Sequence, residues 1–253
     1  MFWGTKRANW YAGRAKAAVS ITFDDAHPSQ LDLGIPVLDR HGLRATFYVL
    51  PKRAAKRADG WLRVVATGHE IGNHTMTHPC GVNHISSREN PLESLTIDAV
   101  ERDIGEADDE IVALLGVRPR TFAYPCGHTA VGRGEQKASY VPVVARRFIA
   151  GRGYRSDTAN DPSVCDLAVV DAFHVDGMDA DALLELVDRG VEQERWTVLV
   201  CHEVGEAGPL GIAEDALDAL CRSLAGDRRV WVAPVADVAI RIREQPARRV
   251  LLP

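Results

Sequence analysis

Short apolar runs alternate with amphipathic helical patterns along almost the whole chain, and this alternation restricts the fold more than any other feature. Strands separated by helices form β/α/β units and therefore a parallel sheet. About seven such units in 253 residues predict a closed or nearly closed (β/α) barrel, with a doubly wound open sheet as the alternative. The predicted strands are 17–23, 45–50, a short run within 68–74, 121–124, 168–175, 196–201 and 230–233. The predicted helices are 31–40, 61–67, 96–115, 140–150, 179–191, 212–224 and 235–243.

The length and charge of the chain exclude several classes of partner. We expect one domain over residues 1–253, because 253 residues suit one large domain better than two. The net charge is -5, and the densest basic segment, 52–57, reads as a solvated helix face. No apolar run approaches the length of a membrane span. We therefore predict neither a nucleic-acid nor a membrane partner, and the oligomeric state stays open.

The cysteines and the N-terminus bear on the compartment. Five cysteines spread over a long chain do not suggest a disulfide framework. Cys80, Cys126 and Cys201 are interpreted as small buried apolar side chains, with a thiol beside a metal as the alternative. Residues 1–6 lack the apolar core of a signal peptide. The chain as given is predicted to be cytoplasmic, although a secreted protein trimmed at its N-terminus would look the same.

Two polar stretches can combine into a metal site. The pair Asp24-Asp25 closes the first predicted strand, and two adjacent carboxylates at a strand end repel each other. His74 and His78 are four residues apart, which puts them on one face of a helical turn and suits a single metal ion. Two histidines and one carboxylate leave coordination positions open for water and substrate. The second carboxylate can then act as a base.

A third polar residue follows a strand at the same edge of the predicted sheet. His202 comes directly after the run 196–201 and precedes Glu203. A histidine in this position is usually structural. Because the carboxyl ends of parallel strands cluster, His202 can instead serve as a general acid near the other two stretches.

Four motifs, read in order, resemble the polysaccharide deacetylase family (the NodB-homology domain, carbohydrate esterase family 4). The resemblance runs from about residue 16 to about residue 238. It implies a distorted (β/α) barrel, a divalent metal that is usually zinc (with cobalt or nickel as alternatives), and hydrolysis of an acetyl group from an amide or ester on a sugar. The motifs are Thr22-Phe23-Asp24-Asp25, His74-Thr75-x-x-His78, Phe122-Ala123-Tyr124-Pro125-Cys126-Gly127 and Val200-Cys201-His202.

The resemblance assigns roles to the first two motifs. It implies that Asp24 is the catalytic base and that Asp25, His74 and His78 are the metal ligands. Thr75 matches the small hydroxyl residue that braces the histidine loop.

The same resemblance assigns roles to the last two motifs. His202 matches the catalytic acid, and Val200 stands where a leucine usually forms part of the pocket for the acetyl methyl group. Cys126, which follows Pro125, stands where the family usually has tyrosine. Its backbone N–H is expected to help hold the developing oxyanion, a role that does not depend on the side chain.

The chain departs from the family pattern at three points. Ala123 stands where the family often carries an arginine that orients the base. The acidic residue that tunes the acid histidine has no clean match, with Asp171 and Asp176 as candidates. Ala26 replaces the usual glycine after the acidic pair, which constrains that turn.

Three hypotheses of function follow. The first is a metal-dependent hydrolase that removes N- or O-linked acetyl groups from a carbohydrate. The second keeps the metal site and opens C–N bonds of a small cyclic amide, because aromatic residues form only 6% of the chain and mark no polymer-binding groove. The third is a non-catalytic sugar-binding relative, which the missing arginine motivates. The expected partners are an acetylated carbohydrate or a small amide.

Overall fold

The computed structural model describes residues 10–84 and 89–245. The prediction made for residues 1–6 falls outside this part of the chain. Among the described residues, no helix is both long enough and apolar enough to cross a bilayer.

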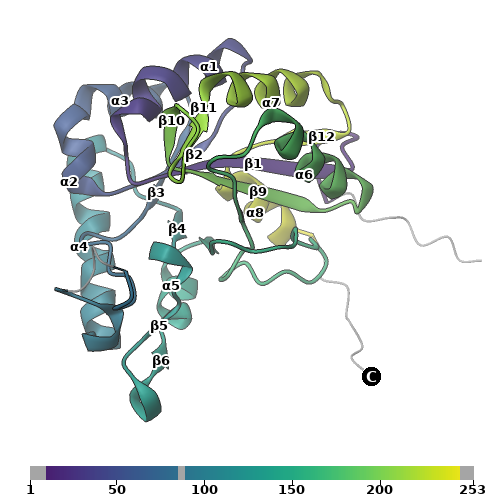
Figure 1. Ribbon diagram of the computed structural model, residues 1–253. Helices are drawn as coiled ribbons and strands as arrows, with labels where there is room; N and C mark the ends of the chain where they lie inside the picture. The colour runs from purple at the N-terminus through teal and green to yellow at the C-terminus, as the bar shows by residue number, and fades with distance from the viewer. Residues whose placement is uncertain (1–9, 85–88, 246–253) are drawn as a thin grey trace, which may run out of the picture.

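A parallel sheet forms the centre of the molecule (Figure 1). Its strands pair in the order β7-β4-β3-β2-β1-β9-β8, and β12 pairs with the first part of β1. The strand bounds are β1 (Ala17–Asp24), β2 (Thr46–Val49), β3 (Glu70–Asn73), β4 (Thr121–Ala123), β7 (Ala150–Arg152), β8 (Phe173–His174), β9 (Trp196–Cys201) and β12 (Val230–Val232).

The sheet curls, and its two ends approach each other. Val170, just before β8, forms a parallel bridge with Arg152 at the end of β7. The Val170 N–H also donates a hydrogen bond to the Gly151 carbonyl at 2.7 Å. The interrupted pairing explains the distortion, and the predicted (β/α) barrel of parallel strands is confirmed.

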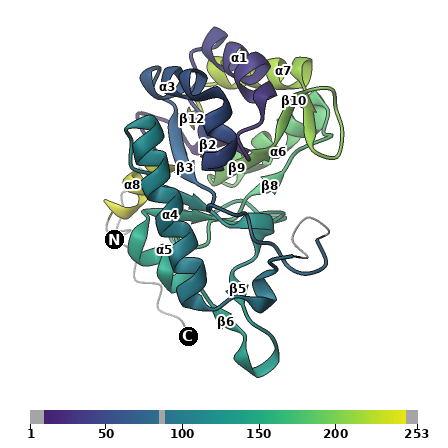
Figure 2. The same ribbon diagram turned by 90° about the vertical axis from the view of Figure 1, so that its left-hand side faces the viewer.

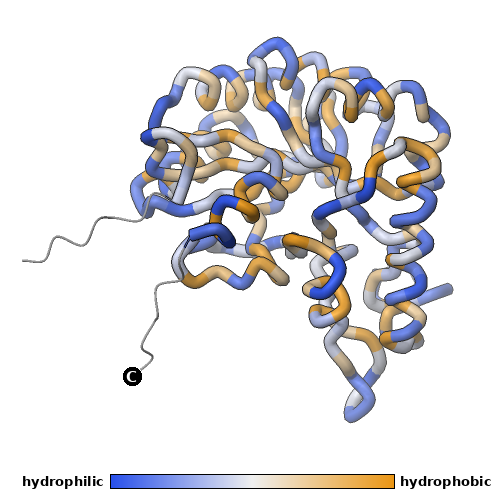
Figure 3. The backbone as a smooth tube through the Cα atoms, turned by 180° about the vertical axis from the view of Figure 1, so that it is seen from behind, coloured by the Kyte–Doolittle hydropathy of each residue, from blue (hydrophilic) through white to orange (hydrophobic). Residues whose placement is uncertain are grey.

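Helices cover the outer face of the curled sheet (Figures 1 and 2). Hydrophilic and hydrophobic stretches alternate along them (Figure 3), as expected for helices with one buried face. The helix bounds are α1 (Ile35–Arg40), α2 (Pro51–Ala54), α3 (Ala58–Ala66), α4 (Ile97–Leu115), α5 (Val141–Arg147), α6 (Ala180–Glu192), α7 (Glu214–Gly226) and α8 (Val235–Arg243).

Helix α4 shows how local signals set an element's ends. The side chain of Thr96 accepts a hydrogen bond from the Ala99 N–H and caps the first turn. Gly116 ends the helix in the left-handed conformation at φ 70°. The helix therefore spans the range that its periodic apolar residues predict.

Four further short strands lie outside the main sheet. β5 (Ala130–Val131) and β6 (Ala138–Ser139) form an antiparallel hairpin between β4 and α5, and the hairpin extends away from the sheet (Figures 1 and 2). β10 (Glu203–Gly205) and β11 (Gly211–Ala213) pair in parallel after β9.

The core fixes the carboxyl end of β1. All eight residues of β1 are buried. Phe23 stacks on Phe47 of β2 with ring centroids 5.1 Å apart, and Trp61 meets Phe47 edge-on at 5.5 Å. Burial of each such side chain contributes about 1.5–3 kcal/mol. The acidic pair that follows Phe23 is thus attached to one of the most firmly packed parts of the molecule.

Two predicted elements differ from the structure near β7. The predicted helix 140–150 ends at Arg147, and Ala150–Arg152 forms a strand instead. Its Ala-Gly-Arg sequence carries no strand signal, so its pairing with β4 decides its conformation. The predicted strand 168–175 contracts to Phe173–His174 with the bridge at Val170 before it.

Candidate metal centre

The acidic pair lies in a tight turn at the carboxyl end of β1. Asp24 is the last residue of the strand, and Asp25 and Ala26 both adopt left-handed conformations at φ 75° and 56°. Such conformations cost on the order of 1–3 kcal/mol each in a non-glycine residue and cluster at functional sites. The turn brings the side chains of both aspartates to the same cavity.

The histidine motif forms a loop after β3, and the expectation of a helical turn is wrong. His74 and Thr75 follow the strand directly, and Thr75 and His78 have φ values of 67° and 54°. The Thr75 Oγ1 accepts a hydrogen bond from the His78 N–H at 2.9 Å, and Asn73 Oδ1 accepts one from the Thr75 N–H at 2.7 Å. Asp103 of α4 accepts three more, one from Met76 and two from Thr77, so the loop is braced on both sides.

Three ligand atoms converge as a single metal ion requires. Asp25 Oδ1 lies 3.7 Å from His74 Nε2 and 3.6 Å from His78 Nε2. Tetrahedral zinc with bonds of 2.0–2.2 Å places such atoms about 3.3–3.5 Å apart. Within the described residues, the buried Asp25 Oδ1 accepts no hydrogen bond. An orphaned buried carboxylate oxygen facing two imidazoles fits a divalent cation.

The surroundings keep the ligands in the protonation states that a metal needs. Burial lowers the pKa of His74, and it lowers that of His78 to about 4, so both rings are neutral at neutral pH. His74 Nδ1 donates to the Ala123 carbonyl at 2.9 Å, which leaves Nε2 as the ligand atom. Burial alone would raise the pKa of Asp25, but the hydrogen bond from His27 and the guanidinium of Arg53, 3.4 Å away, help to hold it below its usual range.

Arg152 supplies the positive charge beside Asp24 that the alanine at position 123 cannot provide. Its fully buried guanidinium, at the end of β7, donates a short hydrogen bond to Asp24 Oδ1. Burial would raise the pKa of Asp24, but the charge of Arg152, together with smaller contributions from His74 and His202, outweighs burial and lowers that pKa. Ala123 and Arg152 are register partners on neighbouring strands. The arginine absent from β4 is therefore replaced from the adjacent strand, which the sequence could not reveal because 150–152 was not recognised as a strand.

His202 is held by Asp176. Its Nδ1 donates to Asp176 Oδ2 at 2.5 Å, and its backbone N–H donates to Asp176 Oδ1 at 3.0 Å. Burial opposes protonation of the ring, but this hydrogen bond and the nearby aspartate charges raise the pKa of His202. Asp171, the other candidate, accepts instead from Ser156 at 2.6 Å. His174 Nε2 approaches the same Asp176 Oδ2 at 3.0 Å.

A buried glutamine, also missed from the sequence, ties two strand ends together. Gln30 Nε2 donates to the Asp24 carbonyl at 2.6 Å and to the His202 carbonyl at 2.7 Å. The proposed base and the proposed acid thus have their backbones connected through a single side chain.

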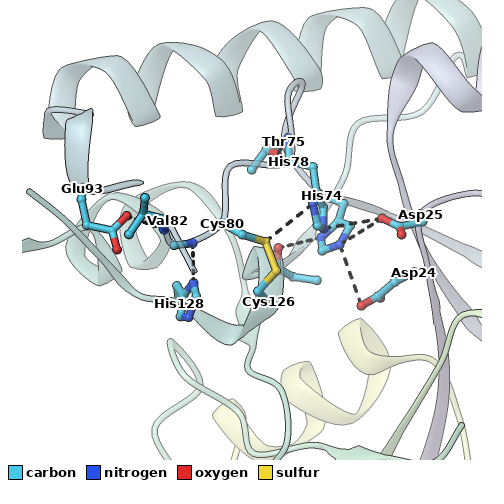
Figure 4. Close-up of a disulfide and its surroundings, with 12 residues drawn as sticks. Asp24, Asp25, His74, Thr75, His78, Cys80, Val82, Glu93, Cys126 and His128 are labelled. Carbon is cyan, nitrogen blue, oxygen red and sulfur yellow. Dashed lines mark hydrogen bonds and ion pairs between the residues drawn. A yellow bond between two sulfur atoms is a disulfide. The ribbon is translucent and has the colours of Figure 1, made fainter. Parts of the chain in front are cut away.

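The interpretation of the cysteines as separate buried side chains is wrong for two of them. Cys80 and Cys126 form a disulfide across 46 residues of sequence (Figure 4). It joins the loop after β3 to the turn Pro125–Gly127 after β4. Two loops at the same edge of a parallel sheet meet in space, which sequence spacing does not show. Within the turn, Cys126 has a left-handed backbone at φ 55°.

The predicted metal ligands line one cavity of about 440 Å³ at the carboxyl ends of the strands, together with Asp24, Cys126 and His202. The supporting residues Thr75 and Pro125 are not among its lining residues. Val200 lies elsewhere, buried in the core near the end of β9. The lining residues are Asp24, Asp25, His27, Leu50, Arg53, His74, Thr77, His78, His84, Cys126, Tyr154, Arg155, His202 and Leu210. The molecule is thus a parallel β/α protein with a candidate single-metal centre in a cavity at the carboxyl edge of its sheet.

Comparison with known proteins identifies the family. The family profile described as polysaccharide deacetylase matches residues 12–138, about half of the chain, and the chain belongs to this family. A chitooligosaccharide deacetylase of Rhizobium leguminosarum bv. trifolii is 35% identical over 103 residues, which cover 40% of this chain and 43% of that protein. A peptidoglycan-N-acetylglucosamine deacetylase of Bacillus cereus is 30% identical over 129 residues, covering 49% and 42%.

A solved structure extends the likeness of fold over the whole chain. A Mycobacterium smegmatis protein, described as a polysaccharide deacetylase, aligns over 96% of both chains with a TM-score of 0.67 and 15% identity. The matches to the two curated relatives, by contrast, span less than half of each. The fold is therefore shared over almost the full chain, whereas the family profile matches its first half.

Proposed function

We propose that this chain is a metal-dependent hydrolase that removes acetyl groups from a carbohydrate. One observation carries the proposal: the ligand atoms of Asp25, His74 and His78 lie in the same cavity as Asp24, paired with Arg152, and His202, paired with Asp176. Metal-assisted hydrolysis of an amide or ester needs a base, an acid and a metal site close together. Here the base is paired with a cation, the acid is paired with an anion, and both lie beside three metal ligands. The names of the two curated relatives support an acetylated amino sugar as the substrate.

The chain's own residues divide the proton transfers between them. Asp24, kept ionised by Arg152, accepts the proton of the attacking water. The backbone N–H of Cys126 donates to the oxygen on which negative charge develops. His202, kept protonated by Asp176, gives its proton to the leaving amine or alcohol. Thr75 braces the loop that carries His78, and Pro125 begins the turn that carries Cys126.

Asp25, His74 and His78 would hold the metal. We propose zinc first, with cobalt or nickel as alternatives, because two imidazoles and one carboxylate suit all three ions. When bound, such an ion lowers the pKa of water and polarises a carbonyl.

Hydrolysis of a defined panel tests the proposal, measured as acetate release from the acetylated sugars and as ring opening of the cyclic amides. The panel contains N-acetylglucosamine oligomers, acetylated xylan and small cyclic amides, assayed after chelation and after zinc, cobalt or nickel is added back. We expect turnover of the acetylated sugars only with metal, and turnover slower by about 10²–10⁴-fold in Asp24→Asn. Asp171→Asn serves as the matched control, because Asp171 bonds Ser156 outside the cavity. Turnover of the cyclic amides alone would favour the amidohydrolase alternative, and metal binding without any turnover would favour the non-catalytic one.

The cytoplasmic location stays a prediction, and the disulfide gives a way to test it. Structural disulfides are rare in the reducing cytosol. Trapping free thiols in intact cells and measuring the fraction of Cys80 and Cys126 that is labelled would decide. A fully labelled pair agrees with the cytoplasm, and a fully protected pair contradicts it.

A further inference from the structure

The imidazole of His78 lies between two sets of ligand atoms (Figure 4). On one side, its Nε2 is 3.6 Å from Asp25 Oδ1 in the candidate metal centre. On the other side, its Nδ1 is 3.8 Å from the Sγ of Cys80. The second side has no part in the function proposed above.

The second set has the spacing of a metal site. His78 Nδ1 and the sulfurs of Cys80 and Cys126 all lie within 4.8 Å of one another. Tetrahedral zinc, with bonds of about 2.3 Å to sulfur and 2.0–2.1 Å to nitrogen, places sulfur and nitrogen ligands about 3.6 Å apart. The observed 3.8 Å is close to this value. Only the bond between the two sulfurs prevents them from acting as thiolate ligands.

We propose that reduction of the Cys80–Cys126 disulfide creates a second metal site, made of both sulfurs and His78 Nδ1. With a phosphine as reductant, the S–S bond breaks and the phosphine becomes its oxide by taking the oxygen of one water. The two hydrogens of that water go to the two sulfurs. A divalent cation then displaces one proton from each thiol to the solvent. The reductant can enter from the cavity, because Cys126 lines it and is half-buried.

The two sites exclude each other, because they use the same ring. A neutral imidazole offers one nitrogen with a free lone pair, so His78 binds a metal through Nε2 or through Nδ1. Thiolates are softer ligands than the carboxylate and imidazole they replace, and they favour zinc and cobalt. Reduction therefore draws the ion from Asp25 and His74 to Cys80 and Cys126. The effect on catalysis rests on the proposed function, whereas the new site does not.

Cobalt absorption under anaerobic conditions tests the proposal. The metal-free protein is titrated with Co²⁺ before and after reduction by a phosphine. We expect a thiolate-to-cobalt charge-transfer band in the near ultraviolet only after reduction. The matched control is the double variant Cys80→Ser/Cys126→Ser, which keeps Cys165, Cys201 and Cys221 and should show no band under the same reductant. Absence of the band in the reduced wild type, or an equal band in the control, overturns the proposal.

Two histidine variants test whether the ring is shared. Reduced His74→Ala should keep the band, because His74 does not belong to the second site. Reduced His78→Ala should bind cobalt more weakly, and an unchanged affinity would refute the role of His78. At one equivalent of cobalt, acetate release should fall as the band grows, while the double serine variant should be insensitive to reductant. A protein that shows the band yet hydrolyses nothing in either state would refute the proposed function and leave the second site standing.

Discussion

The two halves of the sheet contribute to the site in different ways. In the first half of the chain, β1 ends at Asp24 and is followed by Asp25, and the loop after β3 carries His74 and His78. Strands β7 and β9 and the segment after β8, in the second half, supply Arg152, His202 and Asp176. The first set comprises the proposed metal ligands and the proposed base. The second set comprises the proposed acid and the groups that shift the pKa values of the base and the acid.

The difference lies in what determines each position. The first set depends on local turns, such as the left-handed conformations of Asp25 and Thr75. The second set depends on pairing, because Arg152 reaches Asp24 only through the register of β7 beside β4. The match to the family profile ends at residue 138, before the second set begins. Local sequence thus encodes the ligands, and the tertiary fold encodes their control.

Removal of a ligand in the first half should have the largest effect. Asp25→Ala leaves two imidazoles without a carboxylate, and we expect metal content to fall to background and activity with it. Asp24→Asn keeps all three ligands, so it should retain the metal while kcat/KM falls by about 10²–10⁴-fold. Metal analysis and acetate release measure both. If Asp25→Ala still holds one equivalent of metal and full activity, the ligand assignment is wrong.

Loss of Arg152 tests whether the second half controls the first. Arg152→Met leaves Asp24 buried without its partner, which should lower the free energy of unfolding by about 3–5 kcal/mol and abolish most activity. The double variant Arg152→Met/Ala123→Arg moves the guanidinium to the neighbouring strand. Urea denaturation and kcat/KM should both recover in part. Equal defects in the single and double variants would show that a charge on β4 cannot replace one on β7.

The sequence predicts the first half of the site better than the second for physical reasons. The adjacent aspartates and the closely spaced pair His74 and His78 indicate a metal site whatever the local backbone conformation is. The cluster was therefore predicted correctly even though the expected helical turn is a loop. Arg152 was missed because its three-residue strand has no periodicity to detect. The choice between Asp171 and Asp176 likewise depended on which side chain the closure of the sheet directs toward His202. No spacing rule relates Cys80 to Cys126, because only the folded chain brings their two loops together.

The disulfide connects two loops of the first half, and its contribution to stability should be next in size. A cross-link across 46 residues restricts the unfolded chain by about 3–4 kcal/mol. Cys80→Ser/Cys126→Ser should therefore lower the urea midpoint under oxidising conditions. Cys165→Ser, which removes an unpaired half-buried cysteine, is the matched control and should change it little. Equal midpoints for the double variant and the wild type would mean that the local loops hold this half without the cross-link.

Asp176 should give the smallest effect, and one that pH resolves. His202 must be protonated to act as an acid, and its raised pKa extends activity toward alkaline pH. Asp176→Asn removes the charged acceptor, so the pKa of His202 falls and the alkaline limb of the kcat/KM profile moves to lower pH. Loss of a hydrogen bond to a charged group costs about 1.5–3 kcal/mol, or roughly 10–100-fold in rate.

The control for this variant is His174→Gln, which removes a ring that competes for the same Asp176 oxygen at 3.0 Å. It should move the alkaline limb in the opposite direction, because Asp176 then interacts with His202 alone. Two shifts of opposite sign would establish that Asp176 tunes the acid rather than merely supporting the fold. A lower rate in Asp176→Asn with an unmoved alkaline limb would restrict the second half of the sheet to a structural role at this position.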